Sequence, residues 1–301
     1  MEKPNRRLIF ILLLLIFIAS ISCDNSGKSK FRVDNDIIFD TIRTEKRFHI
    51  EEDTLNPYCD ISVKFIYPIG GTTEDIEVLQ QFFIQSMFGS SFNQFEPAVA
   101  VETYVRNYLE NYSQDAETYK ETVNDMKELN SLIPGMDIHD SEHAISDTFY
   151  SYYESLSDSI TFNQYDLISF QVKQSNSKGE PNSHYVSYNN YVWNLKNGNQ
   201  LTENDIFVSG YDSVLHNLLI ASLIEQNKVE SLDELEDLGF FGVGEIVPNN
   251  NFLINDKGIT YTFNKGEYSA YQLNAPEVFI PFNDIRQLIR ENSIVSKLAN
   301  L

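Results

Sequence analysis

The pattern of hydrophobic and polar positions divides the chain into blocks of strands and helices. Apolar and polar residues alternate from Asp40 to Ile50 and again from Asp60 to Ile69, which is the period of a half-buried strand. Apolar residues then recur at helical spacing from Glu74 to Phe88 and from Val99 to Leu132. The first half of the chain therefore predicts two strands followed by two helices.

After residue 146 the pattern changes to runs rich in β-branched and aromatic residues. These runs predict strands over 149–153, 159–174, 185–195, 259–263 and 277–282. Helices are expected over 212–226 and within LDELEDLGF (232–240). Asn283 or Asp284 is expected to cap a final helix that carries Ile285, Leu288 and Ile289. Strands, then helices, then strands and helices together predict an α+β fold, with two modules of antiparallel strands packed with helices.

An apolar run near the start of the chain predicts where the protein works. Lys3, Arg6 and Arg7 precede the sequence LIFILLLLIFIASISC, which ends at Cys23. A cationic start, a short apolar run and a small residue before cysteine are typical of a bacterial lipoprotein signal peptide, although Ser20 replaces the usual Leu. We expect removal of residues 1–22, lipid attachment at Cys23, and export to the periplasmic or surface face of a bacterial membrane. An uncleaved signal anchor and a freely secreted protein are the alternatives.

The formal net charge of −22 excludes a nucleic-acid-binding protein and favours cationic partners through long-range attraction. The hydrophobic content of 42% and the aromatic content of 13% predict a packed core. The chain has two cysteines, so lipidation of Cys23 leaves Cys59 without a disulfide partner. Cys59 is expected to be a buried thiol in a strand.

His139, Asp140, Ser141, Glu142 and His143 spell H-x-x-E-H, the inverted zincin motif. On one helix, His139 and His143 would share a face with Glu142 between them as base, and a zinc-dependent hydrolase is therefore an alternative. Ser141 is equally suited to cap a helix that begins near Glu142, which would leave His139 outside it. The sequence contains no G-x-S-x-G, C-x-x-C or EF-hand motif. We therefore predict neither a catalytic site nor a metal or other cofactor.

The C-terminal half resembles a known domain family. The segments DLISFQVKQ, HYVSYNNYVWNL, NGNQLTENDIF and GITYTFNKGEYSAYQLNAPEVFIPFNDI follow in the order and spacing of the extracellular domain shared by RsiV-type anti-sigma factors and PdaC-type deacetylases. The upstream run ISVKFIYPIGG, with its helix, resembles the module that usually precedes that domain. TFNKG (262–266) lacks both carboxylates of the deacetylase metal motif TFDDG. The resemblance implies a non-catalytic envelope domain of unknown function, which in the RsiV-like group binds lysozyme.

Together these features predict a signal peptide (1–22), a lipidated tether (23–35), an N-terminal α+β module (36–158) and a C-terminal RsiV/PdaC-like module (159–301). The expected function is binding or sensing of a lysozyme-like cationic protein or a peptidoglycan fragment, and a purely structural lipoprotein is another possibility. Aromatic residues beside acids suit such contacts. The candidate binding residues are Tyr261, Glu267, Tyr268 and Tyr271. Alternatively, Tyr261 points inward as part of the core.

Overall fold

The computed structural model describes residues 35–49, 57–71, 76–132, 151–179, 184–270 and 273–300. Residues 34–301 form one compact unit. The strands are β1 (Ile38–His49), β2 (Tyr58–Gly70), β3 (Tyr152–Gln164), β4 (Leu167–Lys178), β5 (Tyr185–Asn194), β6 (Asn199–Gln200), β7 (Phe252–Ile254), β8 (Gly258–Thr262) and β9 (Glu277–Pro281). The helices are α2 (Ile76–Phe88), η2 (Ser90–Phe92), α3 (Pro97–Leu132), α5 (Glu203–Ile206), α6 (Asp212–Asn227), α7 (Leu232–Asp237), η3 (Val243–Glu245), α8 (Phe282–Ile285) and α9 (Ile294–Leu298).

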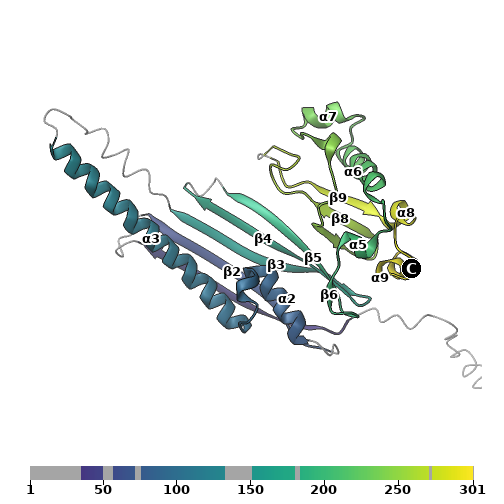
Figure 1. The fold of residues 1–301 in the computed structure, drawn as a ribbon, viewed down its shortest axis with the longest axis horizontal. Helices are drawn as coiled ribbons and strands as arrows, with labels where there is room; N and C mark the ends of the chain where they lie inside the picture. Colours follow the sequence, from purple (N-terminus) through teal and green to yellow (C-terminus); the bar gives the residue numbers. More distant parts are fainter. Residues whose placement is uncertain are drawn as a thin grey trace, which may run out of the picture. The chain divides into compact units, whose positions relative to one another are not determined.

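Strands β1 to β6 form one sheet in sequence order (Figure 1). All neighbouring pairs are antiparallel except β2 and β3, which are parallel. A parallel pair requires a crossover connection, and α2 and α3 lie in the segment that connects these two strands. The strands and helices predicted for the first half of the chain are confirmed, but the module is not antiparallel throughout.

One predicted strand is two strands in the structure. The run expected over 159–174 contains the end of β3, a turn at Tyr165 and Asp166, and most of β4. Both turn residues have positive φ, 57° and 62°, which is the conformation of a two-residue type I′ hairpin. Tyr is rarely found in this conformation, and the run therefore reads as continuous.

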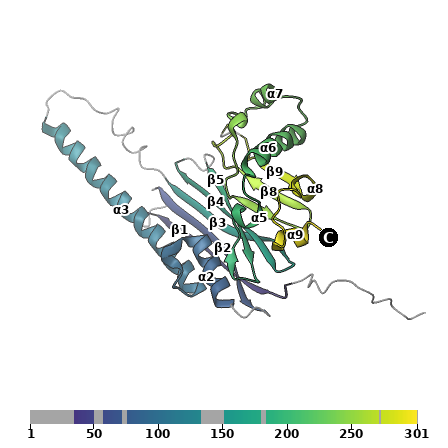
Figure 2. The same cartoon turned by 45° about the vertical axis from the view of Figure 1, so that its right-hand side comes forward.

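The helices α2 and α3 cover one face of the six-stranded sheet (Figures 1 and 2). Helix α2 buries Leu79, Phe83, Ile84 and Met87. The ring of Phe83 stacks on that of Phe170 in β4, with 4.0 Å between centroids. The strands contribute alternate residues to this core, including Ile61, Val63 and Phe65 of β2.

The opposite face of the sheet carries the second core. A three-stranded sheet, ordered β7-β8-β9, packs with α5, α6 and α7 around Phe252, Tyr261 and Leu219. Strand β7 is absent from the predicted elements. The Ser169 hydroxyl joins the two sheets, since it donates to the Ile254 carbonyl oxygen (2.7 Å) and accepts from the Ile254 amide (3.2 Å).

The α+β fold class is confirmed. The module boundary predicted between residues 158 and 159 falls inside β3, and the six-stranded sheet continues across it. Cys59 is buried as expected, and burial raises the pKa of its thiol to about 12. None of the helices within the described ranges is long and apolar enough to cross a membrane.

Candidate functional site

The predicted binding residues occupy different environments. Tyr261 is 0% exposed, because β8 is the central strand of its sheet and is buried on both faces. Its ring packs against Phe252, with 5.8 Å between centroids, and against Phe263. The structure therefore places Tyr261 in the core, which was the alternative interpretation, and not on a binding surface.

Glu267 and Tyr268 lie in the turn that follows Phe263. Glu267 is exposed, and Tyr268 is half-buried with its ring edge against Phe263 at 5.2 Å. The carbonyl oxygen of Tyr268 accepts a hydrogen bond from the Phe241 amide (3.0 Å). The two residues thus lie beside the segment that follows α7, whereas Tyr271 lies outside the described residues.

The residues in and around α7 form an acidic surface. The sequence analysis predicted a short helix in this segment but did not predict a binding surface there. No lysine, arginine or histidine occurs between residues 229 and 256. Ser231 caps the helix by accepting from the Glu234 amide, and acids in the first turn suit the positive end of the helix dipole. The exposed carboxylates of this surface belong to Glu230, Asp233, Glu234, Glu236, Asp237 and Glu245.

Three large apolar side chains are exposed among these acids. Leu238 is 47% exposed, Phe241 44% and Val247 55%. The chain turns sharply between them at Gly239 and Gly242, where φ is 96° and 62°. Apolar anchors surrounded by charge are typical of protein-binding surfaces. We call residues 230–247 the α7–η3 surface, and the turn with Glu267 and Tyr268 borders it through the Phe241 contact.

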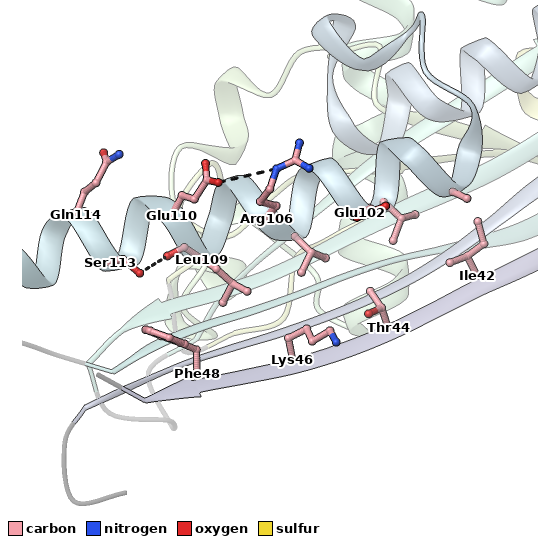
Figure 3. A pocket seen from close by; sticks show the side chains of 13 residues that line it. Ile42, Thr44, Lys46, Phe48, Glu102, Arg106, Leu109, Glu110, Ser113 and Gln114 are labelled. Carbon is pink, nitrogen blue, oxygen red and sulfur yellow. Dashed lines mark hydrogen bonds and ion pairs between the residues drawn. The ribbon is translucent and has the colours of Figure 1, made fainter. Parts of the chain in front are cut away.

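An apolar groove of about 770 Å³ lies between β1 and α3 (Figure 3). Ile42, Thr44, Lys46 and Phe48 line it from alternate positions of β1. One face of α3 lines the other side of the groove with apolar residues, which are Ala98, Val101, Val105 and Leu109. The polar lining residues of α3 are Glu102, Arg106, Glu110, Ser113 and Gln114. Arg106 and Glu110 form an ion pair (3.9 Å) on the solvent side of α3. The groove exists because β1 is an edge strand that α3 covers incompletely.

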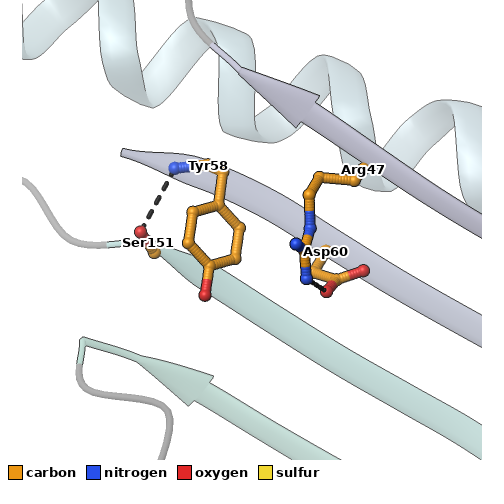
Figure 4. A network of polar contacts seen from close by, with 4 residues as sticks. All are labelled: Arg47, Tyr58, Asp60 and Ser151. Atoms are coloured by element: carbon orange, nitrogen blue, oxygen red, sulfur yellow. Dashed lines mark hydrogen bonds and ion pairs between the residues drawn. The ribbon is translucent and has the colours of Figure 1, made fainter. Parts of the chain in front are cut away.

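On the other face of β1 and β2, Arg47 and Asp60 are register partners and form an ion pair (Figure 4). The Arg47 guanidinium also lies over the ring of Tyr58, 4.7 Å from its centroid. Ser151 accepts a hydrogen bond from the Tyr58 amide (3.2 Å). A charge on this open sheet face is thus neutralised by its cross-strand neighbour.

Two buried carboxylates of β3, Glu154 and Asp158, lie on the face of the six-stranded sheet that α2 and α3 cover. Glu154 accepts from the Tyr104 hydroxyl and from Gln174 Nε2 (2.9 Å). Asp158 accepts from the Ile66 amide (2.7 Å), and burial raises its pKa to about 7. Both groups are almost inaccessible to solvent, at 4% and 3% exposed, which suits a structural role.

The remaining candidates are not placed. Within the described ranges, no group of three His, Cys, Asp or Glu side chains is arranged to hold a metal ion. His139, Glu142 and His143 lie outside those ranges, and so does Cys23. The proposed metal motif and the lipid anchor therefore stay predictions from the sequence.

A protein family of unknown function, DUF3298, matches residues 204–283. A solved DUF3298 family structure from Bacteroides fragilis is similar to the chain, with a TM-score of 0.75, 24% identity and coverage of 89% of this chain and 100% of that one. A DUF3298 family structure from Pseudomonas aeruginosa PAO1 has a TM-score of 0.52, 9% identity and coverage of 85% and 97%. At these identities the likeness shows the fold alone.

No curated protein matches the chain. The expected resemblance of the C-terminal half to a domain of unknown function is confirmed. The α7–η3 surface, Glu267 and Tyr268 all lie within the matched residues. Residues 204–283 thus match the DUF3298 family, and the chain is similar in fold to the two bacterial structures.

Proposed function

We propose that the protein is a non-enzymatic binding or sensing protein of the bacterial envelope, anchored by lipid at Cys23, and that its α7–η3 surface binds a cationic protein of the lysozyme type. The observation that carries the proposal is this surface itself. Six exposed carboxylates lie in the same stretch, residues 230–247, as the exposed side chains of Leu238, Phe241 and Val247, and no lysine, arginine or histidine occurs between residues 229 and 256.

Two further features support the proposal. Electrostatic attraction between an acidic surface and a basic partner raises the association rate, while buried apolar anchors slow dissociation. The sequence also resembles the extracellular domain of RsiV-type anti-sigma factors, whose members bind lysozyme. Export and anchoring rest on the signal-peptide pattern that ends at Cys23.

The test is a calorimetric titration of residues 31–301 with a panel of cationic lysozymes and with soluble peptidoglycan fragments. Saturable lysozyme binding that survives moderate salt supports the proposal, because apolar contacts are not screened. Binding of peptidoglycan fragments without binding of lysozyme would mean that the ligand is a cell-wall fragment and not a cationic protein. An absence of binding to either ligand would contradict the proposal.

Two variants locate the contact. Phe241→Ala is expected to weaken lysozyme binding by about 2 kcal/mol, since exposed aromatic anchors often dominate such interfaces. Changing Asp233, Glu234, Glu236 and Asp237 to their amides should slow association. The matched control changes four exposed glutamates of and near α3, Glu96, Glu117, Glu121 and Glu128, to Gln, which alters the net charge equally. Equal effects in both sets would mean that net charge alone attracts the partner.

Metal analysis of the same preparation tests the alternative hydrolase. Stoichiometric zinc that is lost on His143→Ala would support an enzyme that uses His139, Glu142 and His143. Zinc-free protein that binds lysozyme normally would leave the binding function in place.

A further inference from the structure

On the face opposite α2 and α3, the part of the six-stranded sheet that the second core leaves uncovered, here called the open face, carries an unusual set of charges. On β2, Ile61, Val63 and Phe65 point into the helical core, so Ser62 and Lys64 point to the open face. The strand register then places the side chains of this face in rows that cross the sheet. Two of these rows begin at Arg47 and Arg43 of β1, with the row of Glu45 and Ser62 between them, and they can be compared directly.

The residue opposite the arginine differs in charge between the two rows. Arg47 lies opposite Asp60 and forms an ion pair with it. Arg43 lies opposite Lys64, which is a second cation. Lys64 is paired with Ser157 of β3, and Ser157 with Lys173 of β4. Arg43, Lys64 and Lys173 therefore form one row across four strands, here called the cationic row, with Ser157 as its remaining member.

This row is unexpected in a chain with 44 acidic and 22 basic residues. Like charges directly opposite each other on neighbouring strands are destabilising. None of the three cations forms an ion pair within the part of the chain that the structure describes. Glu45 lies two residues from Arg43 on the same face. The charge of Lys64 lowers the pKa of the Asp158 carboxyl, but this carboxylate lies on the helical side and accepts a hydrogen bond from the Ile66 amide (2.7 Å). The repulsion thus lacks a direct counter-charge.

Hydroxyl and aromatic groups surround the cationic row. Ser62, Ser155 and Ser175 form the neighbouring row by the same register. At the β5 end, Lys173 Nζ lies 5.8 Å from the ring centroid of Tyr188. Cations that bind carboxylate, phosphate or sulfate, next to hydroxyls and an aromatic ring, match the groups of an acidic sugar polymer.

The neighbouring three-stranded sheet restricts what can reach the row. Asn251 and Asn264 donate to the Tyr188 carbonyl oxygen (3.0 and 3.2 Å), so this sheet stands on the same face where the row ends. A flat bilayer cannot lie against a sheet face beside such a step, whereas a narrow chain can. The row crosses three strand spacings, roughly 14 Å in all, which is the scale of a short oligosaccharide.

We propose that the cationic row binds an acidic glycan, a polysaccharide that carries carboxylate, phosphate or sulfate groups. The bound anions relieve the repulsion between Arg43 and Lys64. This site is separate from the α7–η3 surface and is independent of the function proposed for it.

The test measures binding of dextran sulfate oligosaccharides to the full chain, with uncharged dextran of equal length as the reference. Changing Arg43, Lys64 and Lys173 to Gln together should weaken binding by about tenfold or more. The matched control changes three exposed lysines elsewhere, Lys196, Lys257 and Lys297, to Gln and should leave binding unchanged. Equal losses in both variants, or no saturable binding to the wild type, would overturn the proposal. Tighter binding of duplex DNA or of anionic vesicles would overturn the choice of a glycan.

A second variant separates binding from folding. Lys64→Glu turns the like-charge pair into an ion pair with Arg43, so it should raise the Tm of the free protein while it weakens glycan binding. A lower Tm together with unchanged binding would contradict the assigned role of the row. Lysozyme titration of the triple variant should match the wild type, which keeps failure at this site distinct from failure at the α7–η3 surface.

Discussion

At the scale of single residues, Asp158 makes stability depend on pH. Its pKa is raised from 3.8 to about 7 by burial, so the folded protein keeps a proton that the unfolded chain releases above pH 4. The stabilisation is complete below the unfolded pKa and is lost as pH rises through the folded pKa. The wild type should therefore lose stability from acidic to neutral pH through this group.

The Asp158→Asn variant removes this titration and keeps an oxygen that accepts from the Ile66 amide. The free energy of unfolding of the variant minus that of the wild type should be about 2 to 3 kcal/mol larger at pH 8 than at pH 5. Urea unfolding of both proteins at the two pH values measures this change. The contributions of the other carboxyl groups cancel, because both proteins contain them. A pH-independent difference would mean that Asp158 titrates near its ordinary pKa in the folded protein.

Gly258 is required by a close backbone approach. A Cβ atom at this position would lie 2.2 Å from the carbonyl oxygen of Ile280 in β9. Gly258→Ala should lower the free energy of unfolding by about 1 to 3 kcal/mol, because β8 and β9 must separate. Gly244→Ala is the control, since its nearest neighbour is a side-chain atom at 3.9 Å. Equal thermal stability of the two variants would contradict this explanation.

Residue chemistry also explains why the sequence analysis missed the turn between β3 and β4. Turns are recognised by Gly, Asn or Pro, yet the hairpin between β3 and β4 turns at Tyr165 and Asp166. Tertiary contacts compensate for the missing signal, because Asn35 accepts from the Asp166 amide (2.8 Å) and donates to the Leu167 carbonyl oxygen (2.7 Å). No local pattern reveals a residue 131 positions away.

At the scale of elements, Asn251 connects the two sheets. Its Nδ2 group donates to the carbonyl oxygens of Tyr188 (3.0 Å) and Thr262 (2.9 Å), and its Oδ1 atom accepts from the Asn190 amide (2.7 Å). Asn251→Ala removes the acceptor of the Asn190 amide, whereas the Tyr188 and Thr262 carbonyl oxygens keep Asn264 and Asn249 as donors. Because three hydrogen bonds are lost and one amide is left without this partner, the free energy of unfolding should fall by about 2 kcal/mol. Asn217→Ala, at an exposed position of α6, should change stability little. Chemical unfolding compares the two, and similar midpoints would refute the role of Asn251.

Elements with strong periodicity were predictable and those fixed by tertiary contacts were not. Residues 76–88 and 97–132 show helical spacing over several turns, and both helices are confirmed. Strand β7 has only three residues, and its hydrogen bonds to Ser169 depend on a strand 85 positions away. Three residues are too few to show the alternation of apolar and polar positions that predicts a strand.

At the scale of the whole molecule, charge is separated into surfaces that the sequence only partly reveals. The acids of α7 are contiguous and visible in LDELED, although their exposure beside Phe241 and Tyr268 needs the fold. The cationic row unites β1, β2 and β4, and depends on a parallel pairing across a long helical connection. Neither the register nor the face of Lys173 relative to Lys64 follows from spacing in the chain.

The continuous sheet predicts that the two modules fold as one unit. Residues 36–158 alone would end inside β3, and residues 159–301 would lack Leu156 and the β2 partner of β3. Each fragment would expose one side of a core, since Phe162 and Leu167 pack with the C-terminal helices while Ile168 and Phe170 pack under α2.

We therefore expect residues 31–301 to unfold in a single calorimetric transition whose van't Hoff and calorimetric enthalpies agree. The fragments 36–158 and 159–301, produced separately, should show neither a cooperative transition nor dispersed amide resonances. A fragment cut at residue 202 is the sharper control, because it retains the whole six-stranded sheet and loses only the elements that cover Phe162, Leu167 and Val192. Cooperative unfolding of either half alone would show that each core is self-sufficient, and that the shared sheet contributes little to the stability of the whole.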